Sequence, residues 1–336
     1  MKEAIFYKCF DDNIVQCFLC NFYCKIKNNN LGRCCVRKNI NGKLYSMNYN
    51  SICSANIEPI EKKSLFHFQP GQNSFSISAL GCNFQCNFCE NWEISQSPRL
   101  KEKTNCLTKS YKPVEIINNA ITNKCSSISY TYTEPTVFME LVSECGLLAK
   151  EKGLSNVLVS NGYMTIETID YLSNFIDGIN IDLKSFSNNF YKKVCKSSIQ
   201  PVLKTLKHIV KNTNIWLEIT TLVIPGLNDS DKELKQIAKF IYEELSPHIP
   251  WHISRFYPTF KRIENKTTPI ETLSKAYNFG KSIGLYYVYN CENENTFCHK
   301  CNKLLIERSG FKIKKNNFKK NNCSFCGAKI EGKFEI

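Results

Sequence analysis

The central part of the chain alternates short apolar runs with longer stretches of helical periodicity. Six runs have strand length and are rich in β-branched or aromatic residues: in chain order FSISAL, SISYTY, NVLVS, GINIDLK, IWLEITTLV and WHISRF. Apolar residues recur at helical spacing over residues 136–152, 201–211, 230–244 and 268–283. Strands and helices that alternate about six times predict a parallel sheet with helices outside it. We therefore predict an α/β fold, with a partial (β/α)6 TIM-like barrel over residues 71–290.

Cysteine-rich segments flank this central region on both sides. Residues 1–70 carry the turn signals KNNNLG and NINGK and lack the apolar periodicity of an independent core. Residues 291–336 contain two pairs of closely spaced cysteines. The sequence thus predicts a Cys-rich N-terminal segment with a possible metal site, the barrel, and a C-terminal zinc ribbon.

The composition indicates a cytoplasmic protein. Hydrophobic residues make up 43% of the 336 residues, and the start MKEAIFYKCFDDNIVQC has no apolar stretch that would act as a secretory signal or membrane span. Thiols stay reduced in the cytoplasm. The odd number of 19 cysteines therefore indicates metal ligation or redox chemistry instead of a disulfide framework.

The net charge of +14 raises the question of nucleic-acid binding, because Lys and Arg neutralise phosphates. Arg is rare, however, and nearly all of the positive charge is Lys scattered among many Asn. We therefore expect no nucleic-acid partner, and no membrane partner.

Three cysteines lie within eight positions directly after the first predicted strand. Cys82, Cys86 and Cys89 follow Gly81, which places them at a strand's carboxyl end, where barrels carry their chemistry. No His or fourth Cys follows closely, whereas structural zinc needs four ligands. The set is then a partial zinc site completed from elsewhere, a group of ordinary buried thiols, or the ligands of a [4Fe–4S] cluster with one open iron. The last interpretation is the one we favour.

The spacing CxxxCxxC, with Phe88 before the last Cys, resembles the signature of the radical S-adenosylmethionine (radical SAM) superfamily. The resemblance implies a [4Fe–4S] cluster whose fourth iron binds S-adenosylmethionine. It further implies reductive cleavage of that cofactor to methionine and a 5′-deoxyadenosyl radical, which abstracts a hydrogen atom from a substrate. Zinc could not donate the electron that this reaction needs.

The ends of the following strands carry polar residues that fit this resemblance. SYTYTEPT stands where the family has a Gly-Gly-Glu-Pro-like element, so Glu134 is a candidate for contact with the cofactor's ammonium group. Asn161 ends the third strand. In NIDLK, alternation puts Asp182 and Lys184 on one face, available to the cofactor's ribose and carboxylate groups. Surface residues beside a turn are the alternative, above all for Asn161. His252 or Arg255 could face the substrate.

A narrower resemblance covers nearly the whole chain. IEPIEKKSLFHFQPG, TTLVIPGLNDS, WHISRFYPT and the ending CHKCNKLLIERSGF…CSFCG are similar to the AmmeMemoRadiSam-system radical enzymes, relatives of pyruvate formate-lyase activating enzymes. This resemblance implies action alongside AMMECR1- and Memo-domain proteins, with an electron donor such as flavodoxin or ferredoxin. Activation of a glycyl-radical enzyme is an alternative.

Two further cysteine sets are candidate metal sites. The tail pairs form a predicted zinc ribbon, with rubredoxin-like iron as the alternative: Cys298, Cys301, Cys323 and Cys326. The N-terminal set could hold either zinc or an auxiliary iron–sulfur cluster: Cys17, Cys20, Cys24 and Cys34. Cys35 competes with Cys34 for the fourth position. Cys195 could be a substrate-side thiol.

A second class of function remains possible on sequence alone. The chain could be a non-catalytic iron–sulfur or zinc protein, acting as an electron carrier or as a nucleic-acid binder. A carrier would have no use for Glu134 or for the polar face of Asp182 and Lys184, so we favour the enzyme.

Overall fold

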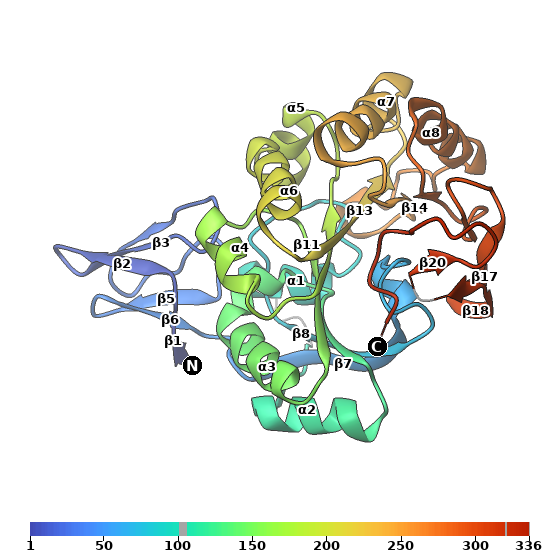
Figure 1. The fold of residues 1–336 in the computed structure, drawn as a ribbon. Coiled ribbons are helices and arrows are strands. Elements are labelled where there is room, and N and C mark those ends of the chain that lie inside the picture. The colour runs from blue at the N-terminus through green and yellow to red at the C-terminus, as the bar shows by residue number, and fades with distance from the viewer. Residues whose placement is uncertain (101–105, 320, 336) are drawn as a thin grey trace.

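A nine-stranded mixed sheet forms the centre of the molecule (Figure 1). The computed structural model describes residues 1–100, 106–319 and 321–335; residues 101–105, 320 and 336, which fall in the predicted barrel and tail, lie outside the described residues. In spatial order the strands are β15 (Val288–Tyr289), β14 (Trp251–Arg255), β13 (Trp216–Val223), β12 (Gly178–Asp182), β11 (Ser155–Ser160), β10 (Ser127–Tyr130), β8 (Asn73–Ala79), β7 (Ser51–Pro59) and β9 (Lys109–Ser110).

The predicted α/β class is confirmed, and all six predicted strands are present and mutually parallel: β8, β10, β11, β12, β13 and β14. The sheet is open, with β15 and β9 at its edges, as an incomplete barrel requires. Strands β7 and β9, which are antiparallel to their neighbours, were not predicted from the sequence. Strand β7 lies within residues 1–70, so the sheet begins about twenty residues before the predicted barrel boundary.

Helices cover the outside of the sheet, α5 to α8 on one side and α2 and α3 on another (Figure 1). The helices are α1 (Trp92–Ser95), α2 (Pro113–Thr122), α3 (Met139–Glu151), α4 (Ile166–Leu172), α5 (Asn188–Phe190), α6 (Gln200–Asn212), α7 (Asp231–Phe240) and α8 (Ile270–Ile283). The four predicted helices correspond to α3, α6, α7 and α8. A 3-10 turn, Pro135–Phe138, precedes α3, and a π-helical turn, Ile241–Leu245, extends α7.

Residues 1–50, here called the N-terminal lobe, form two small antiparallel sheets beside the barrel (Figure 1). One contains β1 (Lys2–Glu3), β6 (Lys43–Ser46) and β5 (Arg37–Ile40), and the other β2 (Tyr7–Phe10), β3 (Ile14–Cys17) and β4 (Lys25–Ile26). Val15, Leu19 and Leu44 are buried in the same apolar cluster as the barrel helices. The lobe therefore folds against the barrel and shares its core, in agreement with its weak apolar periodicity.

The tail packs on the opposite side of the barrel from the N-terminal lobe (Figure 1). It contains β16 (Thr296–Phe297), β17 (Leu304–Ser309), β18 (Lys312–Asn316), β19 (Phe318–Lys319) and β20 (Asn322–Cys323). A parallel bridge joins Phe68 to Lys333, and the Gln69 amide donates to the Lys333 carbonyl at 2.6 Å. The segment before β8 thus fixes the tail to the barrel. Among the described residues, no helix has the length and apolarity to cross a membrane.

Candidate functional site

The three-cysteine loop lies at the carboxyl end of β8, where the sequence predicts it. Gly81 begins the loop with φ +105°, a left-handed conformation that favours glycine. Backbone hydrogen bonds then fix the loop to a π-helical turn, Tyr191–Cys195: the Gln85 amide donates to the Cys195 carbonyl at 3.0 Å and the Asn87 amide to the Val194 carbonyl at 3.2 Å. The loop is therefore held by the element that follows β12.

A cavity of about 550 Å³ opens at the carboxyl ends of the strands, within the usual range for small-molecule sites. Every residue predicted to bind the first cluster or its cofactor lines it: Cys82, Cys86, Phe88, Cys89, Glu134, Asn161, Asp182 and Lys184. These residues come from four successive strand ends that are distant in sequence. The structure thus brings the whole predicted set to one space.

Cys86 is buried, Cys82 and Cys89 are partly buried, and all three thiols hold their protons when no metal is bound. Burial raises the pKa of Cys82 well above its usual value, and the charge of Glu134 adds to the effect. A hydrogen bond with the Cys195 thiol, together with burial, raises the pKa of Cys86 well above its usual value. Burial raises the pKa of Cys89 to about 11. A metal that binds here must therefore displace protons.

Glu134 ties two strand ends together through both carboxylate oxygens. Its Oε1 accepts hydrogen bonds from the Thr136 amide at 3.1 Å and from Ser160 Oγ at 2.9 Å, and also from the Thr136 hydroxyl. Its Oε2 accepts from the Asn161 amide at 2.8 Å. Asn161 in turn donates from Nδ2 to Asn83 Oδ1 at 2.7 Å, directly beside Cys82. Glu134 therefore positions the turn that borders the cysteine loop.

Tyr132 adopts the backbone conformation that glycine would supply at this position. Its φ of +63° is left-handed, and its carbonyl accepts from Asn91 Nδ2 at 3.0 Å. The Tyr132 hydroxyl donates to Glu58 at 2.6 Å, and Lys63 Nζ lies 4.7 Å from its ring centroid. These contacts offset the strain, so a non-glycine residue is accommodated where the resembling family has glycine.

Asp182 and Lys184 form an ion pair of 2.7 Å beside the cysteine loop. Burial acts to lower the pKa of Lys184, but Asp182 and the Cys86 thiol outweigh it and raise that pKa well above its usual value. The ammonium also lies 5.9 Å from the centroid of Phe88, whose buried ring packs on Phe190. Lys184 therefore keeps a positive charge next to the thiols.

Neither His252 nor Arg255 is among the residues that line the cavity, so the structure adds no support to the expectation that one of them faces the substrate. His252 Nε2 lies 2.6 Å from the buried Glu218 carboxylate, and Arg255 donates from Nε to the Thr268 carbonyl. Ser254, between them, is the residue of this strand that reaches the cavity. Cys195 is buried against Cys86 and also lies outside the lining, which removes the substrate-side interpretation.

Sequence reasoning missed several lining residues that come from outside the strand-end motifs. Glu58 and Lys63 arrive from the end of β7 and the turn after it, and Phe311 from the β17–β18 hairpin of the tail. The hydroxyl of Thr220 on β13 is buried without a hydrogen-bond partner among the described residues. Thr220 is the one of these residues that lies on a predicted strand, where it is in register with Asp182 on the neighbouring strand.

The tail cysteines have the geometry of a tetrahedral single-ion site. Cys298 and Cys326 have sulfurs 3.7 Å apart, as have Cys301 and Cys323. Four sulfurs at ~2.3 Å from one zinc ion would be about 3.8 Å apart. Among the residues that the structure describes, this is the one group of three or more potential ligands whose atoms all lie within 4.8 Å of one another. Cys291 is exposed and does not belong to it.

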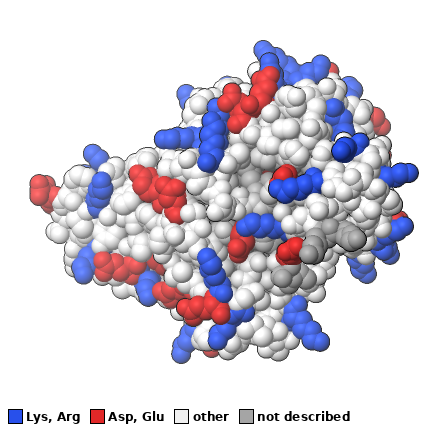
Figure 2. Space-filling view, in the orientation of Figure 1, with Lys and Arg blue, Asp and Glu red and all other residues white. Residues whose placement is uncertain are grey.

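Positive side chains do not gather in one strip on the face shown in Figure 2. Lys and Arg there are interspersed with Asp and Glu over the lobe and the barrel. This distribution agrees with the expectation that the net charge reflects scattered Lys residues.

Comparison with known proteins decides the family. A family model of the radical SAM superfamily matches residues 76–241, which run from β8 into the turn after α7. An uncharacterized protein of Methanocaldococcus jannaschii is 44% identical over 338 residues, covering 98% of this chain and 99% of the relative. This chain belongs to the radical SAM superfamily. It is therefore a radical SAM enzyme, and membership implies a [4Fe–4S] cluster and S-adenosylmethionine.

Other radical SAM relatives place the chain near the activating enzymes. A putative glycyl-radical enzyme activating enzyme of Methanocaldococcus jannaschii is 28% identical over 242 residues, covering 70% of this chain and 86% of the relative. A radical SAM methyltransferase from Sphaerobacter thermophilus has the same fold, with a TM-score of 0.50 at 16% identity, over 66% of this chain and 67% of the other. The non-catalytic alternative is set aside, because the superfamily is one of enzymes.

Proposed function

We propose that this enzyme cleaves S-adenosylmethionine reductively and uses the resulting radical to abstract a hydrogen atom from a substrate or partner protein. The observation that carries the proposal is the cavity in which the Cys82, Cys86 and Cys89 loop meets the polar ends of the next strands. Thiols, an acid, an amide and an ammonium face one space there, which is the set of groups that a charged, zwitterionic cofactor would need.

The lining fits a multi-iron cluster better than a single ion. The loop thiols are not part of the one group of ligand atoms gathered within 4.8 Å, which is in the tail. Cys195 touches Cys86 from outside the cavity, so among the described residues no fourth thiol faces the open side. When bound, the cluster and S-adenosylmethionine would supply the electron transfer that releases methionine and a 5′-deoxyadenosyl radical.

The chain's own residues would bind and orient the cofactor. Among the described residues Glu134 Oε2 accepts a hydrogen bond only from Asn161, so it keeps acceptor capacity for an ammonium group. Asp182 and the unpartnered Thr220 hydroxyl can hydrogen-bond ribose hydroxyls, since both line the cavity. Lys184 keeps a positive charge beside the thiolates and the cofactor's carboxylate. Phe88 walls one side of the space.

The test is anaerobic reconstitution with iron and sulfide, followed by dithionite and S-adenosylmethionine. We expect 5′-deoxyadenosine from the parent and none from Cys86→Ala. Cys195→Ala is the matched control, since it removes a thiol that touches Cys86 but lies outside the lining, and it should keep the activity. Electron paramagnetic resonance of the reduced protein should change when S-adenosylmethionine is added. An unchanged spectrum and no 5′-deoxyadenosine from the parent would refute the proposal.

A glycyl-radical enzyme is the second candidate substrate. It is favoured by the 28% identity to a putative glycyl-radical enzyme activating enzyme over 86% of that relative. We also propose, from the resemblance of the whole chain, a role alongside AMMECR1- and Memo-domain proteins with flavodoxin or ferredoxin as electron donor. Pull-down of each candidate by the reconstituted enzyme, with transfer of a radical signal to the captured protein, distinguishes them.

We propose structural zinc for the tail site, because the sulfur spacing of 3.7 Å is that of a tetrahedral single-ion cage. The cytoplasm is the proposed location, because reduced thiols are needed for both metal sites. Metal analysis of the protein prepared without added iron should return about one zinc per chain.

A further inference from the structure

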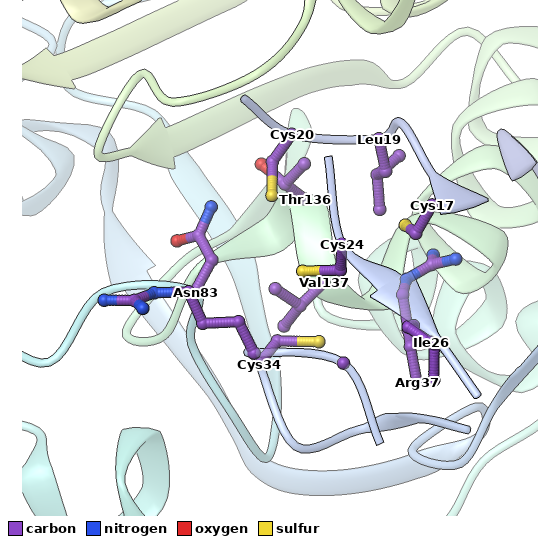
Figure 3. Close-up of a pocket in the computed structure, with 12 residues that line it drawn as sticks. Cys17, Leu19, Cys20, Cys24, Ile26, Cys34, Arg37, Asn83, Thr136 and Val137 are labelled. Carbon is purple, nitrogen blue, oxygen red and sulfur yellow. The ribbon is translucent and has the colours of Figure 1, made fainter. Parts of the chain in front are cut away.

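Four cysteine side chains of the N-terminal lobe face one small cavity (Figure 3). Cys17 ends β3, Cys20 and Cys24 lie in the turn before β4, and Cys34 precedes β5. Their sulfur atoms point into the same space from these separate stretches of backbone (Figure 3). We propose that these four thiolates hold a second [4Fe–4S] cluster, next to the one that binds S-adenosylmethionine.

The spacing of the thiols separates this site from the zinc cage in the tail. Ligands of one zinc ion lie about 3.8 Å apart. The four lobe cysteines are all within the described residues, yet they are not among the groups whose ligand atoms lie within 4.8 Å of one another. Four cysteines that line one cavity can place one thiolate on each iron of a cubane cluster.

The fold also selects the fourth ligand, which the sequence leaves open. Cys34 is buried and lines the cavity, whereas Cys35 has a left-handed φ of +61° and turns its thiol to the Arg33 carbonyl, 3.7 Å away. Gly32 makes room for this turn, because a Cβ there would lie 3.0 Å from Ile26 Cδ1. Cys35 is therefore a neighbour of the site and not a ligand.

Unpartnered donors around the cavity point to a missing anionic group. Arg33 Nε, Arg37 Nε and Asn83 Nδ2 are buried and have no hydrogen-bond partner among the described residues, and all three residues line the cavity. The Arg37 guanidinium also donates from Nη2 to Glu140 at 2.7 and 2.8 Å, so its Nε is the part left without an acceptor. Buried donors of this kind are stabilised by an acceptor. A cluster with four thiolates is a net anion whose sulfur atoms accept N–H hydrogen bonds, so it would satisfy these donors.

One layer of residues separates the lobe cavity from the main cavity, which holds the Cys82, Cys86 and Cys89 loop. Asn83 lines the lobe cavity and is the residue after Cys82, and Thr136 lines the lobe cavity while its amide donates to Glu134 in the main cavity. This part of the inference rests on the proposed function. The oxidised lobe cluster would accept one electron from a reduced small carrier protein, which is thereby oxidised. The lobe cluster, now reduced, would pass that electron to the neighbouring cluster and return to its oxidised state.

The experiment compares reconstituted variants by iron and zinc content and by electron paramagnetic resonance after dithionite. The parent should bind about eight irons, and a variant with Cys82, Cys86 and Cys89 all changed to Ala should keep about four. Cys20→Ala combined with Cys24→Ala should also bind about four. Cys35→Ala is the matched control, with about eight. The parent spectrum should show spin interaction that is absent from the sum of the two variants.

Each outcome decides one claim. If the variant with Cys82, Cys86 and Cys89 changed to Ala binds no iron, the proposed lobe cluster is refuted, whatever the iron content of the parent. A second zinc ion per chain, bound in the lobe, would also refute it. Eight irons in the Cys20 and Cys24 variant would also overturn it. If the lobe cluster forms but the parent makes no 5′-deoxyadenosine, the proposed function fails and this inference stands. The triple variant leaves the lobe unaltered, so misfolding of the lobe cannot explain a loss of iron there.

Discussion

At the scale of single residues, Lys184 is the group whose charge bears most directly on the thiols. Its ammonium is held at 2.7 Å from Asp182 and keeps its proton because of that carboxylate and the thiols. We predict that Lys184→Met lowers the reduction potential of the cluster and slows 5′-deoxyadenosine formation by about 10²-fold, since a positive charge that stabilises the reduced cluster is lost. A redox titration and product chromatography measure both quantities.

The control for this substitution is Lys62→Met, which removes an exposed charge from the mouth of the same cavity. It should leave the reduction potential of the cluster unchanged, because exposed charges are screened. The rate of 5′-deoxyadenosine formation should change by no more than about twofold. Equal rates for Lys184→Met and the parent would contradict the assignment.

Glu134 gives a second prediction at this scale. In Glu134→Gln an NH₂ group must face either the Ser160 hydroxyl and Thr136 or the Asn161 amide, all of which are donors in the native structure. We expect a loss of about 1–3 kcal/mol in the free energy of unfolding, with weaker S-adenosylmethionine binding. Thermal unfolding and equilibrium dialysis measure these effects. Glu151→Gln, at the exposed end of α3, should leave both values unchanged.

At the scale of elements, the β17–β18 hairpin links the tail to the main cavity. Phe311 at its tip is 46% exposed and still lines the cavity. We predict that Phe311→Ala weakens S-adenosylmethionine or substrate binding by roughly three- to tenfold through lost apolar contact, while the zinc and iron contents stay those of the parent. Phe325→Ala, exposed in the same tail but outside the cavity lining, is the control. Identical affinities in the two variants would show that the hairpin tip does not contact the ligand.

The zinc site should hold the tail together as an element. Its apolar cluster is small, centred on Tyr287, Leu305 and Ile330, and burial alone stabilises so short a segment poorly. We predict that Cys301→Ser leaves the barrel folded but makes the chain after residue 291 sensitive to protease. Limited proteolysis with mass spectrometry locates the cuts, and a tail as resistant as the parent's would argue against a structural ion.

Prediction from the sequence succeeded where local patterns decide the structure. The six parallel strands follow from apolar runs. The predicted helix over residues 230–244 corresponds to α7, which Ser230 caps by accepting from the Glu233 amide at 3.3 Å. Strand β7 was not predicted because its residues do not alternate between buried and exposed: one is buried, two are exposed and the others are intermediate. Its position depends on pairing with β8. Two features depend on tertiary contacts that the neighbouring residues in sequence do not determine. One is the choice between Cys34 and Cys35 at the lobe cavity, and the other is the position of Phe311 at the main cavity.

At the scale of the whole molecule, His67 joins the barrel to the tail. Its Nδ1 lies 2.9 Å from the Glu331 carbonyl and its Nε2 2.7 Å from the Tyr289 hydroxyl. Burial lowers the pKa of His67 to about 4, although the nearby Glu218 acts in the opposite direction. The ring is therefore neutral in the folded protein at pH 7.

This burial predicts a pH dependence of stability. The unfolded chain takes up the His67 proton near pH 6.5, whereas the folded protein does so only near pH 4. The free energy of unfolding should fall as the pH drops from about 6.5 to 4, by up to about 3 kcal/mol from this residue. His67→Gln should flatten that slope. Melting temperatures between pH 5 and 8 for both proteins measure it, and parallel curves would contradict the prediction.

The reach of Phe311 into the main cavity has a consequence for biosynthesis. Every other residue that lines this cavity lies between positions 58 and 254. The ribosome therefore synthesises these residues well before the hairpin tip. Earlier parts of a nascent chain fold first. The hairpin tip is therefore the last part of the cavity wall to leave the ribosome and to fold.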